Sequence, residues 1–125
     1  MILRQWHGWT NKSNADAYVD LFRTKGPNVE RVEGRRGAYL LRRDSGDEVE
    51  FVVQHIFDSM EAIRAALGKD YEAARLIPGA EALLSRYDAT CTHYEIDDAP
   101  RGYRAALRSA MVAMDHSLAA FLRSR

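Results

Sequence analysis

The strongest hydrophobic pattern in the chain lies in Gly37–Phe57, where two apolar runs flank the charged turn Asp44-Ser45-Gly46-Asp47. Apolar runs around a turn that contains Gly and Asp are typical of an antiparallel β-hairpin. In the second run, alternate residues share one face of the strand: Val49, Phe51, Val53, His55 and Phe57. That face is apolar apart from His55, and the opposite face is about half apolar. We therefore expect helices to cover the first face and a second copy of the chain to cover the other.

The segments around the hairpin carry the signals of one more strand and two helices. Ile2–Thr10 is predicted to be a strand and Ala15–Lys25 a helix, which Gly26-Pro27 ends or breaks. After the hairpin, Asp58-Ser59-Met60-Glu61 has the form of a capping box in which the Asp58 side chain accepts. We therefore expect a helix over Ser59–Leu67.

The rest of the domain is predicted to hold two helical segments and a final strand. A short helix is expected over Asp70–Arg75, another from Pro78 to about Arg86, and a strand rich in Thr and Tyr over Tyr87–Ile96. The main elements then follow the order β-α-β-β-α-β. This order is the ferredoxin-like plan of an α+β domain, with two helices on one face of a four-stranded antiparallel sheet. We expect residues 1–97 to form this domain.

Residues 98–125 are expected to form a C-terminal helical extension. Within Tyr103–Arg125, apolar residues recur at steps of four and three and make a seam along one helix face: Leu107, Met111, Met114, Leu118 and Phe121. A single helix of this length is marginally stable in water. We therefore expect the seam to pack on its own domain, across a homodimer or on a partner protein.

Composition and charge exclude several classes of protein. The formal net charge is +0, so no basic excess attracts nucleic acid. The single cysteine, Cys91, excludes an intramolecular disulfide and leaves no cysteine-based metal motif. No apolar run reaches the roughly 18–20 residues that cross a bilayer, and the N-terminus lacks the features of a signal peptide. We expect a cytoplasmic protein with no nucleic-acid or membrane partner.

Five segments together resemble the antibiotic biosynthesis monooxygenase family of dimeric α/β-barrel proteins: MILRQWHGW, GAYLLRRDSGDEVEF, FDSMEAIRAALGKDYEAA, IPGAEALLSRYDA and HYEI. The resemblance covers about Met1–Ile96 and leaves out the C-terminal extension. It implies a homodimer in which two sheets meet face to face as a barrel. It also implies a ligand pocket in each subunit between the helices and its own sheet.

The resemblance implies two kinds of chemistry. Some members of the family oxidise polyketide anthrones or quinols with dioxygen and need neither metal nor flavin, whereas others bind and degrade haem. The haem-degrading members are similar in using an Asn, a Trp and a His at the positions where this chain has Trp6, Phe57 and Arg75. All three differ, which disfavours haem. The cofactor-free members also tend to have a Trp where Phe57 stands.

His55 is the candidate catalytic base, because burial keeps an imidazole neutral and able to take a phenolic proton. The alternative is a core histidine bonded to a backbone carbonyl. Tyr71 and Arg75, one turn apart, are the other catalytic candidates: the hydroxyl for a substrate carbonyl, the guanidinium for an enolate or peroxide oxygen. Candidate ligand-binding residues are Trp6, Tyr39, Phe57 and His93, each of which could instead be part of the fold. His7 falls on the opposite face and is expected at the dimer interface.

No Ser/His/Asp order, HExxH motif or GxGxxG loop is present, which argues against hydrolase, zinc-protease and dinucleotide-binding functions. The leading hypothesis is an oxidoreductase-like, cofactor-independent monooxygenase that binds a flat aromatic or quinol molecule. A non-catalytic dimeric binding or assembly module is the alternative, and a haem-degrading monooxygenase is disfavoured.

Overall fold

The computed structural model describes residues 1–102. The predicted helix over Tyr103–Arg125 and its apolar seam lie outside the described residues. Residues 2–95 form one compact unit, and Met1 belongs with the described residues 96–102 to a second unit. In the second unit the Ile96 N–H donates to the Met1 carbonyl oxygen at 3.0 Å. The sheet, the helices and the candidate site all lie within residues 2–95.

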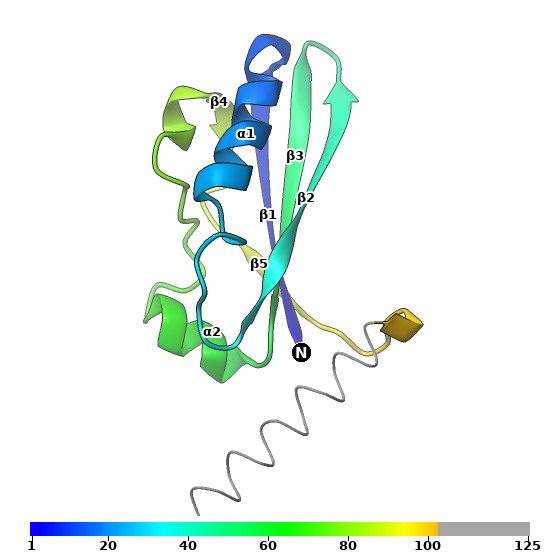
Figure 1. The fold of residues 1–125 in the computed structure, drawn as a ribbon, viewed down its shortest axis with the longest axis vertical. Helices are drawn as coiled ribbons and strands as arrows, with labels where there is room; N and C mark the ends of the chain where they lie inside the picture. Colours follow the sequence, from blue (N-terminus) through cyan, green and yellow to red (C-terminus); the bar gives the residue numbers. More distant parts are fainter. Residues whose placement is uncertain (103–125) are drawn as a thin grey trace, which may run out of the picture. The chain divides into compact units, whose positions relative to one another are not determined.

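Residues 2–95 fold into an α+β unit whose element order confirms the predicted ferredoxin-like plan (Figure 1). Two short 3-10 turns, Lys12–Asn14 and Ala80–Ala82, accompany the main elements. The main elements are β1 (Ile2–Asn11), α1 (Ala15–Lys25), β2 (Arg35–Ser45), β3 (Glu48–Phe57), α2 (Met60–Leu67), β4 (Leu84–Tyr87) and β5 (Thr92–Glu95). The first strand, both helices and the hairpin lie where the sequence pattern predicts them.

The sheet is antiparallel throughout, in the order β2-β3-β1, and two short strands share the outer edge of β1. β4 pairs with residues 8–10 of β1, and β5 pairs with residues 2–5. The single final strand predicted over Tyr87–Ile96 is therefore two strands. The segment between them bonds elsewhere: the Cys91 N–H donates to the Glu72 carbonyl oxygen at 2.7 Å, and the Ala89 oxygen accepts from the Ala74 N–H at 2.9 Å.

The short helix predicted over Asp70–Arg75 does not form. Residues 70–75 make turns and one isolated antiparallel bridge, from Ala73 to Thr90. The cause lies in β1, where the Arg4 guanidinium donates to the carbonyl oxygens of Tyr71 and Ala73. A helix needs those oxygens for N–H groups four residues further along the chain. The segment is thus held open by contacts that are distant in sequence.

The helix predicted from Pro78 to about Arg86 is also wrong, apart from the 3-10 turn Ala80–Ala82. Gly79, just before that turn, has a φ of 92°, which lies outside the helical region and favours glycine. From Leu84 onward the chain pairs with the end of β1 instead of coiling. Sheet pairing therefore overrides the local helical preference of this segment.

The start of α2 differs in detail from the predicted capping box. Ser59, rather than Asp58, caps the helix, because its Oγ accepts from the Ala62 N–H at 3.1 Å. The Asp58 carboxylate instead accepts from Arg36 Nε at 2.8 Å. The Asp58 side chain therefore ties α2 to β2 rather than capping the helix.

One face of the sheet is covered by the helices, as the alternation in β3 predicts. Residues directly opposite each other in antiparallel strands share a face, and the rungs of this face pair β1 with β3 as follows: Ile2 with Phe57, Arg4 with His55, Trp6 with Val53, Gly8 with Phe51, and Thr10 with Val49. α1 packs its Tyr18 ring 4.7 Å from the Phe51 ring, between ring centroids. The covered face thus carries two polar side chains, Arg4 and His55, on one rung.

Apolar residues on this face form two separate buried clusters. The larger cluster joins α1 to the middle of the sheet: Trp6, Ala15, Tyr18, Phe22, Val49, Phe51, Val53 and Ala80. The smaller one joins α2 to the other end of β1 and β3: Ile2, Phe57 and Ile63. The rung of Arg4 and His55 lies between the two clusters, so polar side chains interrupt the core.

Thr10, which lies across from Val49 of the larger cluster, provides a test of core packing. It is fully buried, and its hydroxyl has no hydrogen-bond partner within residues 1–102. A buried unsatisfied polar group costs roughly 1–3 kcal/mol. We predict that Thr10→Val, which replaces the hydroxyl with a methyl, raises the free energy of unfolding by about 1 kcal/mol in urea titrations. Thr10→Ser, which keeps the hydroxyl and loses the methyl, should destabilise the chain. A Thr10→Val variant that unfolds more easily than the native chain would contradict the prediction.

Candidate functional site

A cavity of about 360 Å³ lies between the helices and the covered face of the sheet. This volume falls within the range of small-molecule sites in proteins. Its apolar walls come from both core clusters: Trp6, Tyr18, Phe22 and Val53 from the larger, Phe57 from the smaller. The cavity therefore opens where the two clusters separate, at the rung of Arg4 and His55, which also line it.

The Trp6 ring is positioned by a glycine on its own strand. A Cβ on Gly8 would lie 2.3 Å from the Trp6 ring, so only glycine leaves room for the indole at this place. The indole N–H donates to the Asp88 carbonyl oxygen at 2.8 Å. The ring is thus fixed at both ends, and it presents a flat, buried wall to the cavity.

The Arg4 guanidinium is the buried charge of the site. Arg4 as a whole is only 4% exposed. Besides the oxygens of Tyr71 and Ala73, it donates to His93 Nε2 at 3.2 Å, so that nitrogen is unprotonated. Burial lowers the pKa of Arg4 from its ordinary value, yet a guanidinium keeps its charge in proteins. The site therefore holds a fixed cation.

His55 lies directly across from Arg4 in the β1–β3 ladder. Burial, together with the charges of Arg4 and Arg35, lowers the pKa of His55 to about 3. The imidazole is therefore neutral at pH 7. Its ring stacks on Phe57, with ring centroids 6.3 Å apart and planes 11° apart. Neither ring nitrogen has a hydrogen-bond partner in the part of the chain that the structure describes. The geometry departs from that of a core histidine bonded to a backbone carbonyl.

Further cations surround the cavity. Arg35 donates to the carbonyl oxygens of Pro27 and Glu30, both at 2.8 Å. Arg75 donates to a carbonyl oxygen at the end of α2, and the exposed Lys25 lines the cavity from α1. Within residues 1–102, the carboxylate that lines the cavity is that of Glu30, an exposed residue. The lining thus has an excess of positive charge.

The structure brings together four of the residues predicted for the site: Trp6, His55, Phe57 and Arg75. The other three do not line the cavity. Tyr39 pairs with Gln54 on the opposite face of the sheet and is 49% exposed. It therefore lies on the wrong face to contact a ligand held in the cavity.

Tyr71 and His93 contact Arg4 and do not line the cavity. Their rings meet edge to face with centroids 5.5 Å apart, and the Arg64 guanidinium lies 5.6 Å from the centre of the Tyr71 ring. Burial and the charge of Arg4 lower the pKa of His93. His93 is thus placed to hold Arg4 in position.

Sequence reasoning missed most of the residues that line the cavity, and three of the missed residues bring a charge or a thiol to its chemistry: Arg4, Arg35 and Cys91. Arg4 left a signal, because it stands between Ile2 and Trp6 on the buried face of its strand, where a charge is costly unless paired. Burial raises the pKa of the Cys91 thiol, so it remains protonated. Cys91 is the only cysteine in the sequence.

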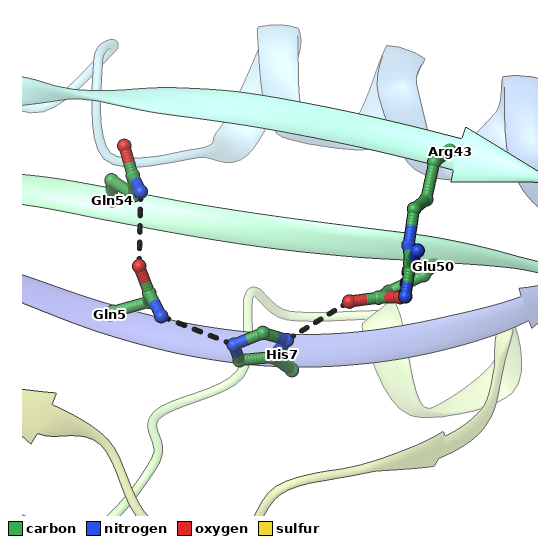
Figure 2. A network of polar contacts seen from close by, with 5 residues as sticks. All are labelled: Gln5, His7, Arg43, Glu50 and Gln54. Atoms are coloured by element: carbon green, nitrogen blue, oxygen red, sulfur yellow. Dashed lines mark hydrogen bonds and ion pairs between the residues drawn. The ribbon is translucent and has the colours of Figure 1, made fainter.

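The opposite face of the sheet carries a polar network in its centre (Figure 2). Gln54 donates to Gln5 at 3.0 Å, and Gln5 lies 3.2 Å from His7 Nε2. On its other side His7 Nδ1 lies 3.2 Å from the Glu50 carboxylate, which also accepts from Arg43 Nε at 2.7 Å. The hydrogen bond from Arg43 is the main cause that lowers the pKa of Glu50. His7 is therefore tied into its own sheet.

Two kinds of feature were not found within residues 1–102. No three side chains of the His, Cys, Asp and Glu types cluster there as metal ligands. No helix in the same part of the chain is both long and apolar enough to span a membrane.

Comparisons with known proteins support the fold alone. No protein-family model matches the chain. No curated protein matches it either. Among solved structures, the chain is similar to a Bacillus cereus protein provisionally described as an antibiotic biosynthesis monooxygenase, with a TM-score of 0.56 and 16% identity. The similarity covers 79% of this chain and 93% of that one. It agrees with the predicted fold, and at this identity it assigns no activity.

The lowered pKa of His55 predicts how stability depends on pH. In the unfolded chain His55 takes up a proton near its ordinary pKa of about 6.5, whereas in the folded chain it remains neutral down to about pH 3. Its contribution to stability is therefore present above about pH 6.5 and is lost progressively as the pH falls toward 3. We predict that His55→Gln loses less unfolding free energy than the native chain between pH 7 and pH 4.5 in urea titrations. Equal losses in the two chains would contradict this prediction.

Proposed function

We propose that this chain is a small cofactor-independent, monooxygenase-like protein that binds a flat aromatic or quinol-type molecule in the cavity between its helices and its sheet. The observation that carries the proposal is that Arg4 and His55 lie across from each other on neighbouring strands, between the aromatic walls of the cavity. A neutral imidazole with unused ring nitrogens lies beside a fixed cation, in a cavity of small-molecule size. The fold that this chain shares with a provisionally described monooxygenase is one that accommodates such a site.

The cavity fits a planar ring that carries a hydroxyl group. Trp6 and Phe57 offer apolar ring surfaces on either side of the polar rung. A neutral imidazole has one nitrogen that accepts a hydrogen bond and one that donates. In the proposed complex, the hydroxyl donates to the accepting nitrogen of His55, which fixes the orientation of the ring.

Burial and the positive charges around His55 make its imidazole too weak a base to keep a proton at pH 7. With a pKa of about 3, the imidazole does not retain a proton at pH 7. The same cations, Arg4 and Arg35, favour the anion of a bound phenol or quinol. We therefore propose that His55 accepts the hydrogen bond and passes the proton on, that the proton ends in solvent, and that the arginines hold the anion.

Oxidation then needs dioxygen as the co-reactant and no further source of electrons. The bound anion gives one electron to dioxygen, and the resulting radical and superoxide combine into a peroxide. The peroxide takes up a proton and loses water. In sum, a quinol and dioxygen give a hydroxyquinone and water, so one oxygen atom enters the product. The protein contributes orientation, charge stabilisation and exclusion of water.

The test of this activity uses 1,4-dihydroxynaphthalene and ¹⁸O₂. We predict ¹⁸O-labelled hydroxynaphthoquinone above the protein-free background, by mass spectrometry, whereas simple autoxidation gives unlabelled naphthoquinone. His55→Phe should lower the rate about tenfold or more, because it removes the group that accepts the hydroxyl proton. Tyr39→Phe, on the opposite face, should not change the rate.

Two results would argue against the activity. If the probe binds and no label enters the product, the chain is a binding module without catalysis. If His55→Phe and the native chain make labelled product at the same rate, His55 has no part in the reaction.

We also propose that a second copy of this chain covers the opposite sheet face. Three large apolar side chains there are 44–51% exposed: Tyr39, Leu41 and Tyr94. In the strand register Tyr39 lies across from Gln54, Leu41 across from Val52, and Tyr94 across from Leu3. The glutamate of the network in Figure 2 is buried within its own sheet. A face that mixes exposed apolar residues with internally paired polar groups is suited to a partner of the same kind.

The oligomeric state tests this interface. We predict that the native chain has twice its chain mass of 14.2 kDa in light scattering after gel filtration. Leu41→Glu should give a monomer, because it places a charge where apolar surface is buried. Val29→Glu is the matched control, since Val29 is 60% exposed and lies outside the sheet, and it should leave the dimer intact. A monomeric native chain would refute the interface.

A further inference from the structure

We propose that the molecule bound in the cavity is an anion, and specifically a planar aromatic carboxylate held by Arg4, Arg35 and Arg75. The inference deepens the proposed function and rests on its small-molecule site. It does not require that the bound molecule reacts with dioxygen. Three features carry the inference: the charge balance of the cavity, the unused hydrogen-bond donors of Arg4 and the flat aromatic walls.

Seven arginines of the described residues 1–102 fall into two groups by their partners. On the outer surfaces of the sheet and its edges, Arg36, Arg42, Arg43 and Arg86 each pair with a carboxylate of their own chain, at 2.7–3.2 Å. Arg4, Arg35 and Arg75 line the cavity and donate to backbone carbonyl oxygens instead. Within residues 1–102 none of these three forms an ion pair with a carboxylate. The charge of Glu30 acts on Arg35, whereas Arg4 and Arg75 have no such partner among the described carboxylates, so positive charge remains in excess at the site.

Arg4 has donors to spare. A guanidinium carries five N–H groups, and the contacts with Tyr71, Ala73 and His93 account for three of them. Nε and one hydrogen of Nη2 make no hydrogen bond to the described residues. Since Arg4 lines the cavity and is only 4% exposed, water outside the cavity does not readily serve these donors. An acceptor within the cavity is the natural partner.

The chemistry of the arginines and the shape of the walls select a carboxylate on a ring. A buried cation is strongly stabilised by an anion that accepts its hydrogen bonds. The planar guanidinium matches the two oxygens of a carboxylate, to which it can donate two parallel hydrogen bonds. The aromatic rings of Trp6 and Phe57 complement a flat hydrocarbon body. His55 adds no charge that would repel an anion, because it is neutral. Glu30, the carboxylate of the lining, is an exposed residue.

Two probes of equal shape test this inference: 2-naphthoate, which is charged, and 2-naphthamide, which is neutral. Isothermal calorimetry measures the affinity of each probe. Protection of Cys91 from alkylation then shows whether the probe binds in the cavity. Because Cys91 lines the cavity and is the only cysteine, a bound probe should slow its alkylation by iodoacetamide, which is followed at about pH 9 so that part of the thiol is ionised. We expect 2-naphthoate to bind about tenfold or more tightly than 2-naphthamide, as hydrogen bonds to charged groups are stronger than neutral ones.

Variants show whether the arginines cause the preference. Arg75→Gln changes an exposed residue and should fold normally, and we expect it to reduce the preference for 2-naphthoate about threefold or more. Arg4→Gln should reduce it further, with its folding checked by thermal unfolding. Arg23→Gln removes the same charge from the exposed side of α1, outside the cavity lining, and should leave the preference unchanged.

Three outcomes would overturn the inference. The first is equal affinity for the two probes, and the second is no protection of Cys91 by either probe at millimolar concentration. The third is a preference for 2-naphthoate that survives both Arg75→Gln and Arg4→Gln. Failure of the oxygenase proposal looks different: 2-naphthoate binds and protects Cys91, while dihydroxynaphthalene yields no labelled product.

Discussion

Burial of the Arg4 guanidinium is the constraint on which the rest of this structure depends. A charge on the covered face of β1 is costly unless it is hydrogen-bonded. The chain meets that cost with the carbonyl oxygens of Tyr71 and Ala73, and with His93 on the neighbouring strand. Those contacts hold residues 70–75 open, separate the two apolar clusters and leave a cavity between them. One charged side chain thus determines both an irregular segment and the site beside it.

Local sequence patterns predicted the parts of the fold that depend on neighbouring residues. The bounds of α1, the hairpin and α2 follow from apolar spacing, a Gly-containing turn and a capping side chain, which act within a few residues. The region after α2 could not be predicted in this way. Its backbone groups bond to residues that lie far along the chain, such as Cys91 with Glu72. Sheet pairing and a distant guanidinium decide its conformation, and neither leaves a periodic trace in the segment itself.

The alternation of side chains along the strands predicts part of the candidate site. His55 and Phe57 were placed on the covered face by the parity of β3, and the structure has them there. Tyr39 was assigned to the pocket by residue type alone. Counting from the hairpin turn, where Ser45 pairs with Glu48, puts Tyr39 opposite Gln54 and on the other face. The charge of Arg4 indicates a site only when it is set against the apolar residues, Ile2 and Trp6, that share its face of the strand.

Gly8 and Trp6 show how the geometry of the site constrains change in the sequence. The indole occupies the space that any side chain at position 8 would need. Replacement of Gly8 alone expels the ring, and loss of the indole alone leaves a hole in the wall. A side chain at position 8 therefore requires a smaller residue than Trp at position 6. Positions 6 and 8 should covary, and a redesign of the site for a larger molecule should begin with that pair.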